Sequence, residues 1–280
     1  MIVDAHQHFW DIERIHYAWL ERPENQALKR TFSPPMLAPL LNEIGIDRTV
    51  LVQALDSRLD TEAMLKFADQ YPWIGAVVGW VPLDEPELAS RQLENYVKHP
   101  KFKGVRHLIH EEANPDWLLR DEVIAGLRLL ASLGIPFDVV AVYPNHLKHV
   151  PTLAERVPNL RMVIDHLAKP PIRSGDIRDW RRQMEQAAAS PQVYAKVSGL
   201  NTASDWASWS YRDWIPYVDA AVELFGPERL MFGSDWPVAT LAGTYRQVWD
   251  ATMAVVERYG DRAKDSIFGG TAQRFYKLEA

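Results

Sequence analysis

The stretch from residue 77 to residue 81 reads Val77-Val78-Gly79-Trp80-Val81, and a second stretch reads Phe137-Asp138-Val139-Val140-Ala141-Val142. Both are nearly continuous in apolar character, which is typical of parallel strands covered on both faces. Similar short runs, bounded by turn residues, recur along the whole chain. The expected strands are residues 2–9, 49–55, 74–83, 102–110, 135–144, 161–170, 193–200 and 229–238.

The intervals between these runs have the pattern and length of crossover helices. Helix-like periodicity is found over residues 35–44, 61–71, 87–99, 118–133 and 211–225. Glycine or proline stops such as Gly45, Pro72 and Pro100 follow the helices and precede the next strand. Eight strand–helix units predict an α/β fold of the (β/α)8 TIM-barrel type. An open doubly wound sheet is disfavoured because the chain has no G-x-G-x-x-G and no G-x-x-x-x-G-K-[ST] motif.

A single domain over residues 1–280 is the simplest expectation, because no linker or low-complexity segment divides the chain. Two connections are unusually long, residues 10–31 and residues 201–214. Long loops after barrel strands line the catalytic mouth, so we expect both to form walls of a pocket.

The composition excludes several classes of partner and cofactor. The 280 residues include 31 Lys+Arg, 37 Asp+Glu and no Cys, with a net charge of −6. This mild acidity favours neither nucleic acid nor a membrane surface as a partner. Without cysteine, any metal must be held by His, Asp or Glu. The N-terminal residues do not resemble a secretory signal, and a cytoplasmic protein is the expectation.

Four polar residues lie at the carboxyl ends of expected strands, where barrel enzymes carry out their chemistry. Asp4, His6 and His8 alternate along the first strand and are expected to share a face. His166 and Asp235 follow the sixth and eighth strands. We therefore expect His6, His8, His166 and Asp235 to converge at one opening.

These residues lie within motifs that resemble the amidohydrolase superfamily, and within it the sugar-acid lactonases such as L-fuconolactonase and L-rhamnonolactonase. The resemblance covers residue 2 to about residue 277. It is carried by Val3-Asp4-Ala5-His6-Gln7-His8-Phe9-Trp10, Gly104-Val105-Arg106-His107, Asp165-His166-Leu167-Ala168-Lys169-Pro170, Lys196-Val197-Ser198-Gly199-Leu200, Phe232-Gly233-Ser234-Asp235-Trp236-Pro237 and Gly270-Thr271-Ala272-Gln273-Arg274-Phe275-Tyr276.

The resemblance implies hydrolysis of a small-molecule lactone. Asp235 is the expected general base for water, and His6, His8 and His166 would polarise the ester carbonyl. The same four residues could instead hold one divalent ion, zinc first. The fifth strand offers Asp138 but no His or Lys, which disfavours two metals. Metal-dependent and metal-free catalysis both stay open at this stage.

Substrate contacts are expected from Arg106 and His107 on the fourth strand, from Lys169 after the sixth, and from Trp236 beside Asp235. Because Arg106 and His107 point to opposite faces, at most one should face the mouth directly. Alternative functions are hydrolysis of a carboxylated lactone of the muconolactone or pyrone type, and decarboxylation within the same superfamily. A catalytically silent binding barrel is disfavoured, because burying four polar groups is costly without a use.

Overall fold

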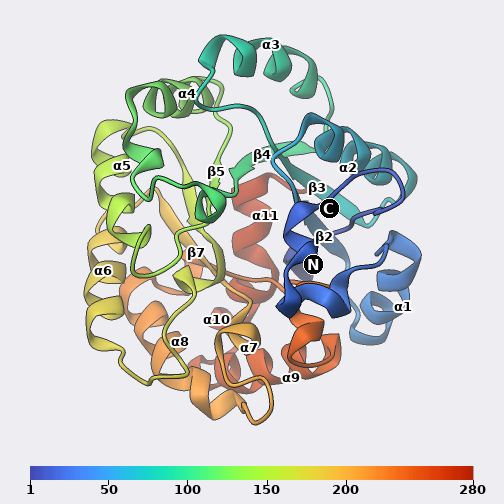
Figure 1. Cartoon of the computed structure of the whole chain (residues 1–280). Helices are drawn as coiled ribbons and strands as arrows, with labels where there is room; N and C mark the ends of the chain where they lie inside the picture. Colours follow the sequence, from blue (N-terminus) through green and yellow to red (C-terminus); the bar gives the residue numbers. More distant parts are fainter. Residues whose placement is uncertain (280) are drawn as a thin grey trace.

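The computed structural model describes residues 1–279, and it confirms the predicted (β/α)8 barrel. The strands are parallel and neighbour one another in chain order (Figure 1). They are β1 (Val3–Gln7), β2 (Arg48–Val52), β3 (Ile74–Gly79), β4 (Phe102–His107), β5 (Phe137–Val139), β6 (Met162–Ile164), β7 (Val193–Val197) and β8 (Leu230–Phe232).

The α-helices surround the strands, except for α11 at the C-terminal end of the chain. They are α1 (Pro34–Ile44), α2 (Arg58–Gln70), α3 (Pro86–Tyr96), α4 (Asp121–Ser132), α5 (Val150–Arg156), α6 (Arg178–Ala188), α7 (Leu200–Ala203), α8 (Tyr211–Phe225), α9 (Tyr245–Val256), α10 (Asp261–Asp265) and α11 (Thr271–Tyr276). Within residues 1–279, none of these helices has the length and apolarity needed to span a bilayer.

Local sequence signals explain where several helices begin and end. Ser57 caps α2 by accepting the backbone N–H of Leu59, and Ser210 with Asp213 forms a reciprocal capping box at the start of α8. Gly45 ends α1 with φ of +84°, a left-handed conformation that glycine adopts without strain. The helices therefore end close to the positions at which the sequence predicts a stop.

The barrel closes between β8 and β1 through backbone hydrogen bonds made by the residues at and just after the ends of these two strands. The His8 N–H donates to the Trp236 carbonyl over 2.7 Å, and the Asp235 N–H donates to the His6 carbonyl over 2.8 Å. The carboxylate of Asp4 accepts the Ser234 N–H at 2.8 Å and the hydroxyl of Tyr245, on α9, at 3.0 Å. The expectation that Asp4 shares a face with His6 and His8 is wrong, because the pairing of β1 with β2 shifts register between Asp4 and Gln7.

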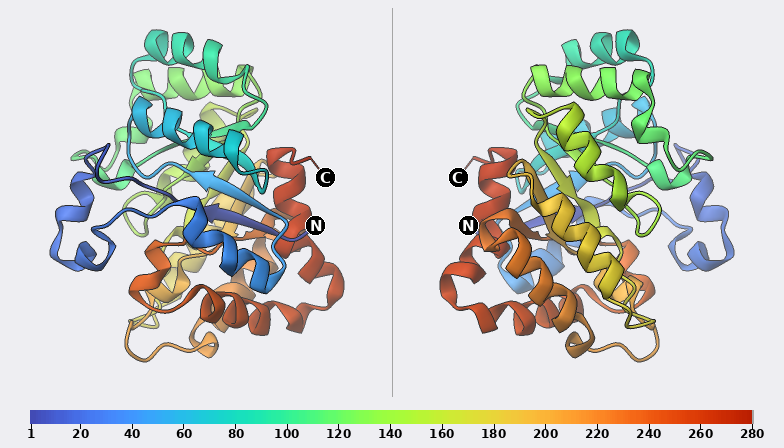
Figure 2. Two further views of the ribbon diagram at one scale, coloured as in Figure 1. Left: turned by 90° about the vertical axis from the view of Figure 1, so that its right-hand side faces the viewer. Right: turned by 90° about the vertical axis from the view of Figure 1, so that its left-hand side faces the viewer.

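Alternate strand residues belong to two apolar clusters. Leu51 packs in the large cluster between strands and helices, whereas Val50 and Val52 pack with Phe275 and Tyr276 of α11. Helix α11 therefore fills one end of the barrel, at the centre of the ring in Figure 1. Figure 2 shows this helix and both termini at the end opposite to the connection that follows β1.

The connection between β1 and α1, residues 8–33, is called loop 1 below. It contains two short helical turns, Ala18–Glu21 and Pro23–Leu28. Trp10 and Phe32 exchange backbone hydrogen bonds at its base, and the Tyr17 hydroxyl donates to the buried Asp60 at 2.7 Å.

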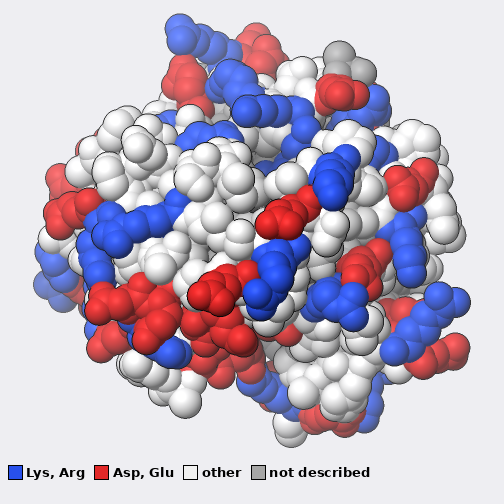
Figure 3. Space-filling model, turned by 90° about the horizontal axis from the view of Figure 1, so that it is seen from above, with Lys and Arg blue, Asp and Glu red and all other residues white. Residues whose placement is uncertain are grey.

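On the molecular face drawn in Figure 3, acidic and basic side chains are interspersed.

Candidate active site

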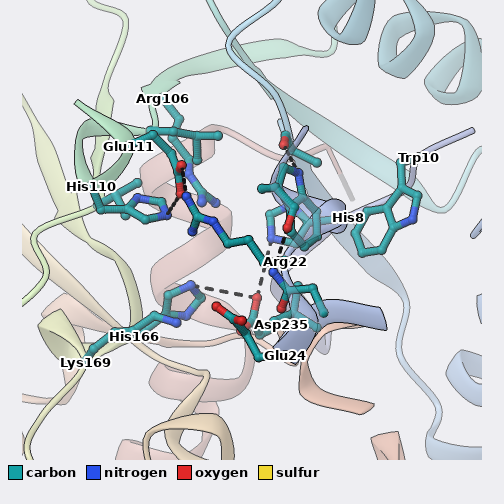
Figure 4. Close-up of a pocket in the computed structure, with 16 residues that line it drawn as sticks. His8, Trp10, Arg22, Glu24, Arg106, His110, Glu111, His166, Lys169 and Asp235 are labelled. Atoms are coloured by element: carbon teal, nitrogen blue, oxygen red, sulfur yellow. Dashed lines mark hydrogen bonds and ion pairs between the residues drawn. The ribbon is translucent and has the colours of Figure 1, made fainter. Parts of the chain in front are cut away.

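A cavity of about 270 Å³ opens at the carboxyl ends of the strands. Its inner wall comes from the barrel and its outer wall from loop 1 and from the turn after β4, Ile109–Glu111. Figure 4 shows the side chains that meet there. The lining residues used below are His8, Trp10, Trp19, Arg22, Glu24, Arg106, His110, Glu111, His166, Lys169 and Asp235.

The structure brings the four predicted residues together at the base of this cavity. The Nε2 atoms of His6, His8 and His166 lie 3.9, 3.4 and 3.8 Å from Oδ1 of Asp235. The Nε2 atoms of His6 and His8 are 3.1 Å apart. Each of the four residues is at least nine-tenths buried. The three imidazoles thus surround one carboxylate oxygen.

The other ring nitrogen of each imidazole has its own partner. His8 donates from Nδ1 to the Val52 carbonyl over 2.7 Å, and Nδ1 of His166 is 2.8 Å from the Ser198 hydroxyl. Nδ1 of His6 lies 3.2 Å from Asp165 Oδ1. Such partners fix the ring orientation, as they do for metal-binding histidines. Every Nε2 is therefore directed towards Asp235.

The donor set fits one divalent ion. Nitrogen and oxygen ligands held at 2.0–2.2 Å in a tetrahedron lie about 3.3 Å from one another. The spacings among His6, His8 and Asp235 are close to this value, and these three form a candidate metal-holding group. The Nε2 atom of His166 lies farther from the group, 3.8 Å from Oδ1 of Asp235. The residues can thus hold a metal, and they can also act directly as hydrogen-bonding groups.

A left-handed turn places His166. The four consecutive residues His166, Leu167, Ala168 and Lys169 all have positive φ, between 48° and 61°. This conformation costs roughly 1–2 kcal/mol for each residue with a side chain. The turn allows Asp165 and His166, which are adjacent in sequence, to contact the same site, although neighbouring residues on a strand point to opposite faces. Asp235 also has a positive φ, 58°.

Two glycines pack directly against the catalytic candidates. A Cβ added to Gly233 would lie 2.6 Å from Cβ of His6. A Cβ added to Gly199, where φ is +58°, would lie 2.8 Å from Nδ1 of His166 and 3.1 Å from Oδ2 of Asp235. A side chain at either position would displace a group of the site, so the close packing requires glycine.

Below the imidazoles lies a buried charge network that sequence reasoning did not single out. Lys196 on β7 is fully buried, and its ammonium lies 2.6 Å from Asp138 Oδ2, 3.1 Å from Asp165 Oδ1 and 3.0 Å from Nδ1 of His6. The Tyr276 hydroxyl of α11 donates to Asp138 over 2.7 Å. Lys196 and Tyr276 lie in motifs that resemble the amidohydrolase superfamily, which could have drawn attention to them. The sequence does not show that both side chains contact Asp138.

Burial and charge set the protonation states. Burial would raise the pKa of Asp235, but His166, His8 and His6 outweigh it and hold the pKa below its usual range. Burial lowers the pKa of His166 to about 4 and the pKa of His6 well below its usual value. At neutral pH, the site therefore holds an ionised Asp235 beside neutral His6 and His166.

Of the predicted substrate contacts, Arg106 and Lys169 line the cavity. Arg106 Nη1 lies 3.0 Å from Nε2 of His6. His107 is directed elsewhere and stacks on Trp117, with ring centroids 4.0 Å apart. Trp236 packs edge-on against Phe9 and Phe32 rather than lining the cavity.

Loop 1 supplies a wall of this cavity, as expected, whereas the second long connection lines a separate cavity of about 690 Å³. Within residues 1–279, the lining of the first cavity includes no residue from 201–214, because Trp209 and Trp214 stack on each other and pack into the surrounding structure. Sequence reasoning placed Trp10 after a strand but selected only Trp236, and it missed Trp19, Arg22, Glu24 and Glu111 as lining residues. Neither strand nor helix periodicity marks residues in irregular loops.

The chain is similar to known proteins in both sequence and overall structure. A sequence model of the amidohydrolase family matches residues 3–278. An L-fucono-1,5-lactonase of Burkholderia ambifaria is 37% identical over 285 residues, which cover 99% of this chain and 96% of that protein. An L-fucono-1,5-lactonase of Burkholderia multivorans is 34% identical over 291 residues, with coverage of 99% and 96%. A crystal structure of a Burkholderia multivorans amidohydrolase with bound zinc has a TM-score of 0.93 and 33% identity, and the match covers 100% of both chains.

Proposed function

The chain belongs to the amidohydrolase family, and on that premise we propose that it hydrolyses the ester ring of an uncharged sugar-acid lactone. The observation that carries this proposal is the position of Asp235 at the base of the cavity, with three imidazole nitrogens within 4 Å of one of its oxygens. Relatives at 37% and 34% identity that are named L-fucono-1,5-lactonase support an aldonolactone as the substrate.

Asp235 is the proposed general base. Its carboxylate is ionised at neutral pH, as the acceptor of a proton from water must be. Attack of that water on the lactone carbonyl creates a negatively charged oxygen, and the ring oxygen then leaves as an alkoxide. Asp235 returns the proton to that alkoxide, so that the product is an open-chain hydroxy acid.

Arg106 is the proposed stabiliser of the developing oxyanion, and the imidazoles hold it in place or hold a divalent ion. The Arg106 guanidinium is permanently charged, lines the cavity and lies 3.0 Å from His6. Positive groups fixed before the reaction stabilise charge in the transition state without reorganising. A divalent ion held by His6, His8, His166 and Asp235 would supply Lewis-acid polarisation at the same place.

The cavity walls suit a polyhydroxylated ring. Trp10 and Trp19 offer flat apolar surfaces, while Glu24, His110 and Lys169 offer acceptors and donors for hydroxyl groups. The volume of about 270 Å³ can hold a small ring but not a polymer. We propose that Lys169 contacts the substrate, whereas His107 and Trp236 act only through neighbouring residues.

A panel of aldonolactones assayed by proton release tests this function, because ring opening liberates one acid per turnover. We expect hydrolysis of at least one 1,4- or 1,5-aldonolactone, and release of carbon dioxide without acid would instead support the decarboxylase alternative. The panel is run before and after chelation, with the metal content of the protein measured in parallel. Full activity of metal-free protein would assign the imidazoles a direct hydrogen-bonding role.

A further inference from the structure

An ion pair links the two outer walls of the cavity. Arg22 lies in loop 1, and Glu111 ends the turn after β4, 89 residues away in the chain. The guanidinium donates to the Glu111 carboxylate, and both side chains line the cavity. Figure 4 shows the Arg22 side chain extending towards Glu111. The side chains are 48% and 30% exposed, so the pair lies where a substrate enters.

The loop 1 end of this bridge is held in place. The Gln26 amide donates to the Arg22 carbonyl at 3.3 Å, and the Asn25 amide donates to the Trp19 carbonyl at 2.9 Å. The Trp19 indole N–H in turn donates to the Ala54 carbonyl, just after β2, at 2.9 Å. Arg22 therefore projects from a loop that is fastened to the barrel.

The Glu111 end is held through His107. An indole N–H can only donate, so the Trp80 N–H at 3.0 Å makes Nδ1 of His107 an acceptor and places the ring proton on Nε2. From Nε2, His107 donates to Glu112 at 2.9 Å. The Leu108 N–H donates to Asp56 over 3.0 Å. The residues on both sides of the turn are thus anchored.

The bridge has a consequence for charge. A substrate carboxylate that entered here would meet a guanidinium already paired with Glu111. Repulsion by Glu111 and Glu24 would oppose its attraction to Lys169, which lines the same cavity. Deeper in the cavity, Arg106 is paired in the same way with Asp165 at 3.5 Å. Hydroxyl groups, in contrast, can bond to both members of a paired Arg and Glu without displacing either.

We propose that Glu111, paired with Arg22, is a specificity-determining residue that selects uncharged lactones over carboxylated ones. The proposal rests on the proposed lactone hydrolysis and deepens it. The carboxylate of Glu111 neutralises Arg22, and loss of either charge changes the electrostatic preference of the cavity mouth in a direction set by the charge that remains.

The test uses Glu111→Gln, Arg22→Gln and the double variant. Each is assayed with a neutral aldonolactone, and an aldarolactone, which adds one carboxylate to a comparable ring, serves as the competitor. We call the competitive inhibition constant of the aldarolactone its competition constant, so that a lower value means tighter binding. We expect this constant to fall about tenfold in Glu111→Gln, because Arg22 becomes free to bind a carboxylate. It should rise in Arg22→Gln, and in the double variant it should return to within about twofold of the wild-type value.

Glu21→Gln is the matched control. Glu21 is the neighbour of Arg22 in loop 1 and pairs with Lys29 at 2.6 Å, but it does not line the cavity. This variant should leave the competition constant unchanged. A purely structural role of the bridge would shift both single variants in the same direction. That result, or no change in either variant, would overturn the proposal.

Different results would refute the proposed lactone hydrolysis and the role of Glu111. A wild-type protein that opens no aldonolactone would refute the proposed function, and calorimetric binding of the aldarolactone would then still show whether the two single variants shift affinity in opposite directions. Hydrolysis of aldonolactones together with an unaltered preference in both variants would refute only the assignment of Glu111.

Discussion

The indole N–H of Trp180 donates to the carbonyl of Leu167 over 2.8 Å, inside the buried left-handed turn that carries His166. Trp180 lies on α6 and is fully buried. Its hydrogen bond is thus one of the contacts that offset the cost of four positive φ angles in a row. A tryptophan on the next helix, with no chemical role of its own, therefore helps to determine where the His166 imidazole lies.

Trp180→Phe should therefore affect both stability and catalysis. The variant keeps most of the buried ring and leaves the Leu167 carbonyl unpaired, which costs about 1–3 kcal/mol. Because the turn also carries Lys169, we expect lower kcat together with altered KM. Urea unfolding and steady-state kinetics measure the two effects. Trp214→Phe removes a similar buried bond, to Ser204 at 3.1 Å, and should lower stability without changing the kinetics; equal kinetic effects in both variants would contradict this assignment.

Replacement of Asp235 tests the proposed base. Asp235→Asn keeps the shape of the side chain but cannot accept the proton of water, so kcat should fall by about 10²–10⁴. Circular dichroism and unfolding curves should show a folded protein. Turnover close to that of the wild type would remove Asp235 from the role of general base.

Gly199→Ala should disable the site by crowding it. The added methyl group would lie 2.8 Å from His166 and 3.1 Å from Asp235, so these groups must separate and kcat should fall by at least about tenfold. Gly175→Ala is the control, because Gly175 also has a positive φ, +72°, but open space around it. The control should lose about 1–2 kcal/mol of stability and no activity. Full activity in both variants would show that the close packing at Gly199 is not needed for catalysis.

The buried Asp60 predicts a pH dependence of stability. Burial raises its pKa from 3.8 to about 6, against the opposing hydrogen bonds from Tyr17 and Ala54. The folded state thus binds this proton more tightly than the unfolded chain, and the contribution of Asp60 is greatest below about pH 4 and is lost as the pH rises to about 6. A pKa difference of about 2 corresponds to about 3 kcal/mol.

Asp60→Asn removes this titration. The difference in unfolding free energy between wild type and variant should therefore shift by about 2 kcal/mol between pH 4 and pH 7, and the wild type should become less stable relative to the variant as the pH rises. Urea unfolding at pH 4, 5, 6 and 7 measures it. A difference that stays constant over this range would show that Asp60 is not responsible.

The elements of the barrel could be predicted because they depend on local patterns. Burial on both faces requires apolar strands, and the amphipathic run over residues 211–225 coincides with α8. His6, His8 and Asp235 could be placed at the mouth because the carboxyl ends of parallel strands meet at one edge of a barrel. The prediction of shared orientation failed for Asp4, since a register shift in β1 cannot be read from alternation.

By itself, the sequence determined the order of strands and helices and the residue types that reach the mouth, because periodicity and chain order act over short distances. Only the tertiary structure decided that Lys196 lies among Asp138, Asp165 and His6, that a left-handed turn aims His166, and that Arg22 meets Glu111. These pairings join segments far apart in the chain, and their geometry depends on packing, burial and backbone angles that no local pattern specifies.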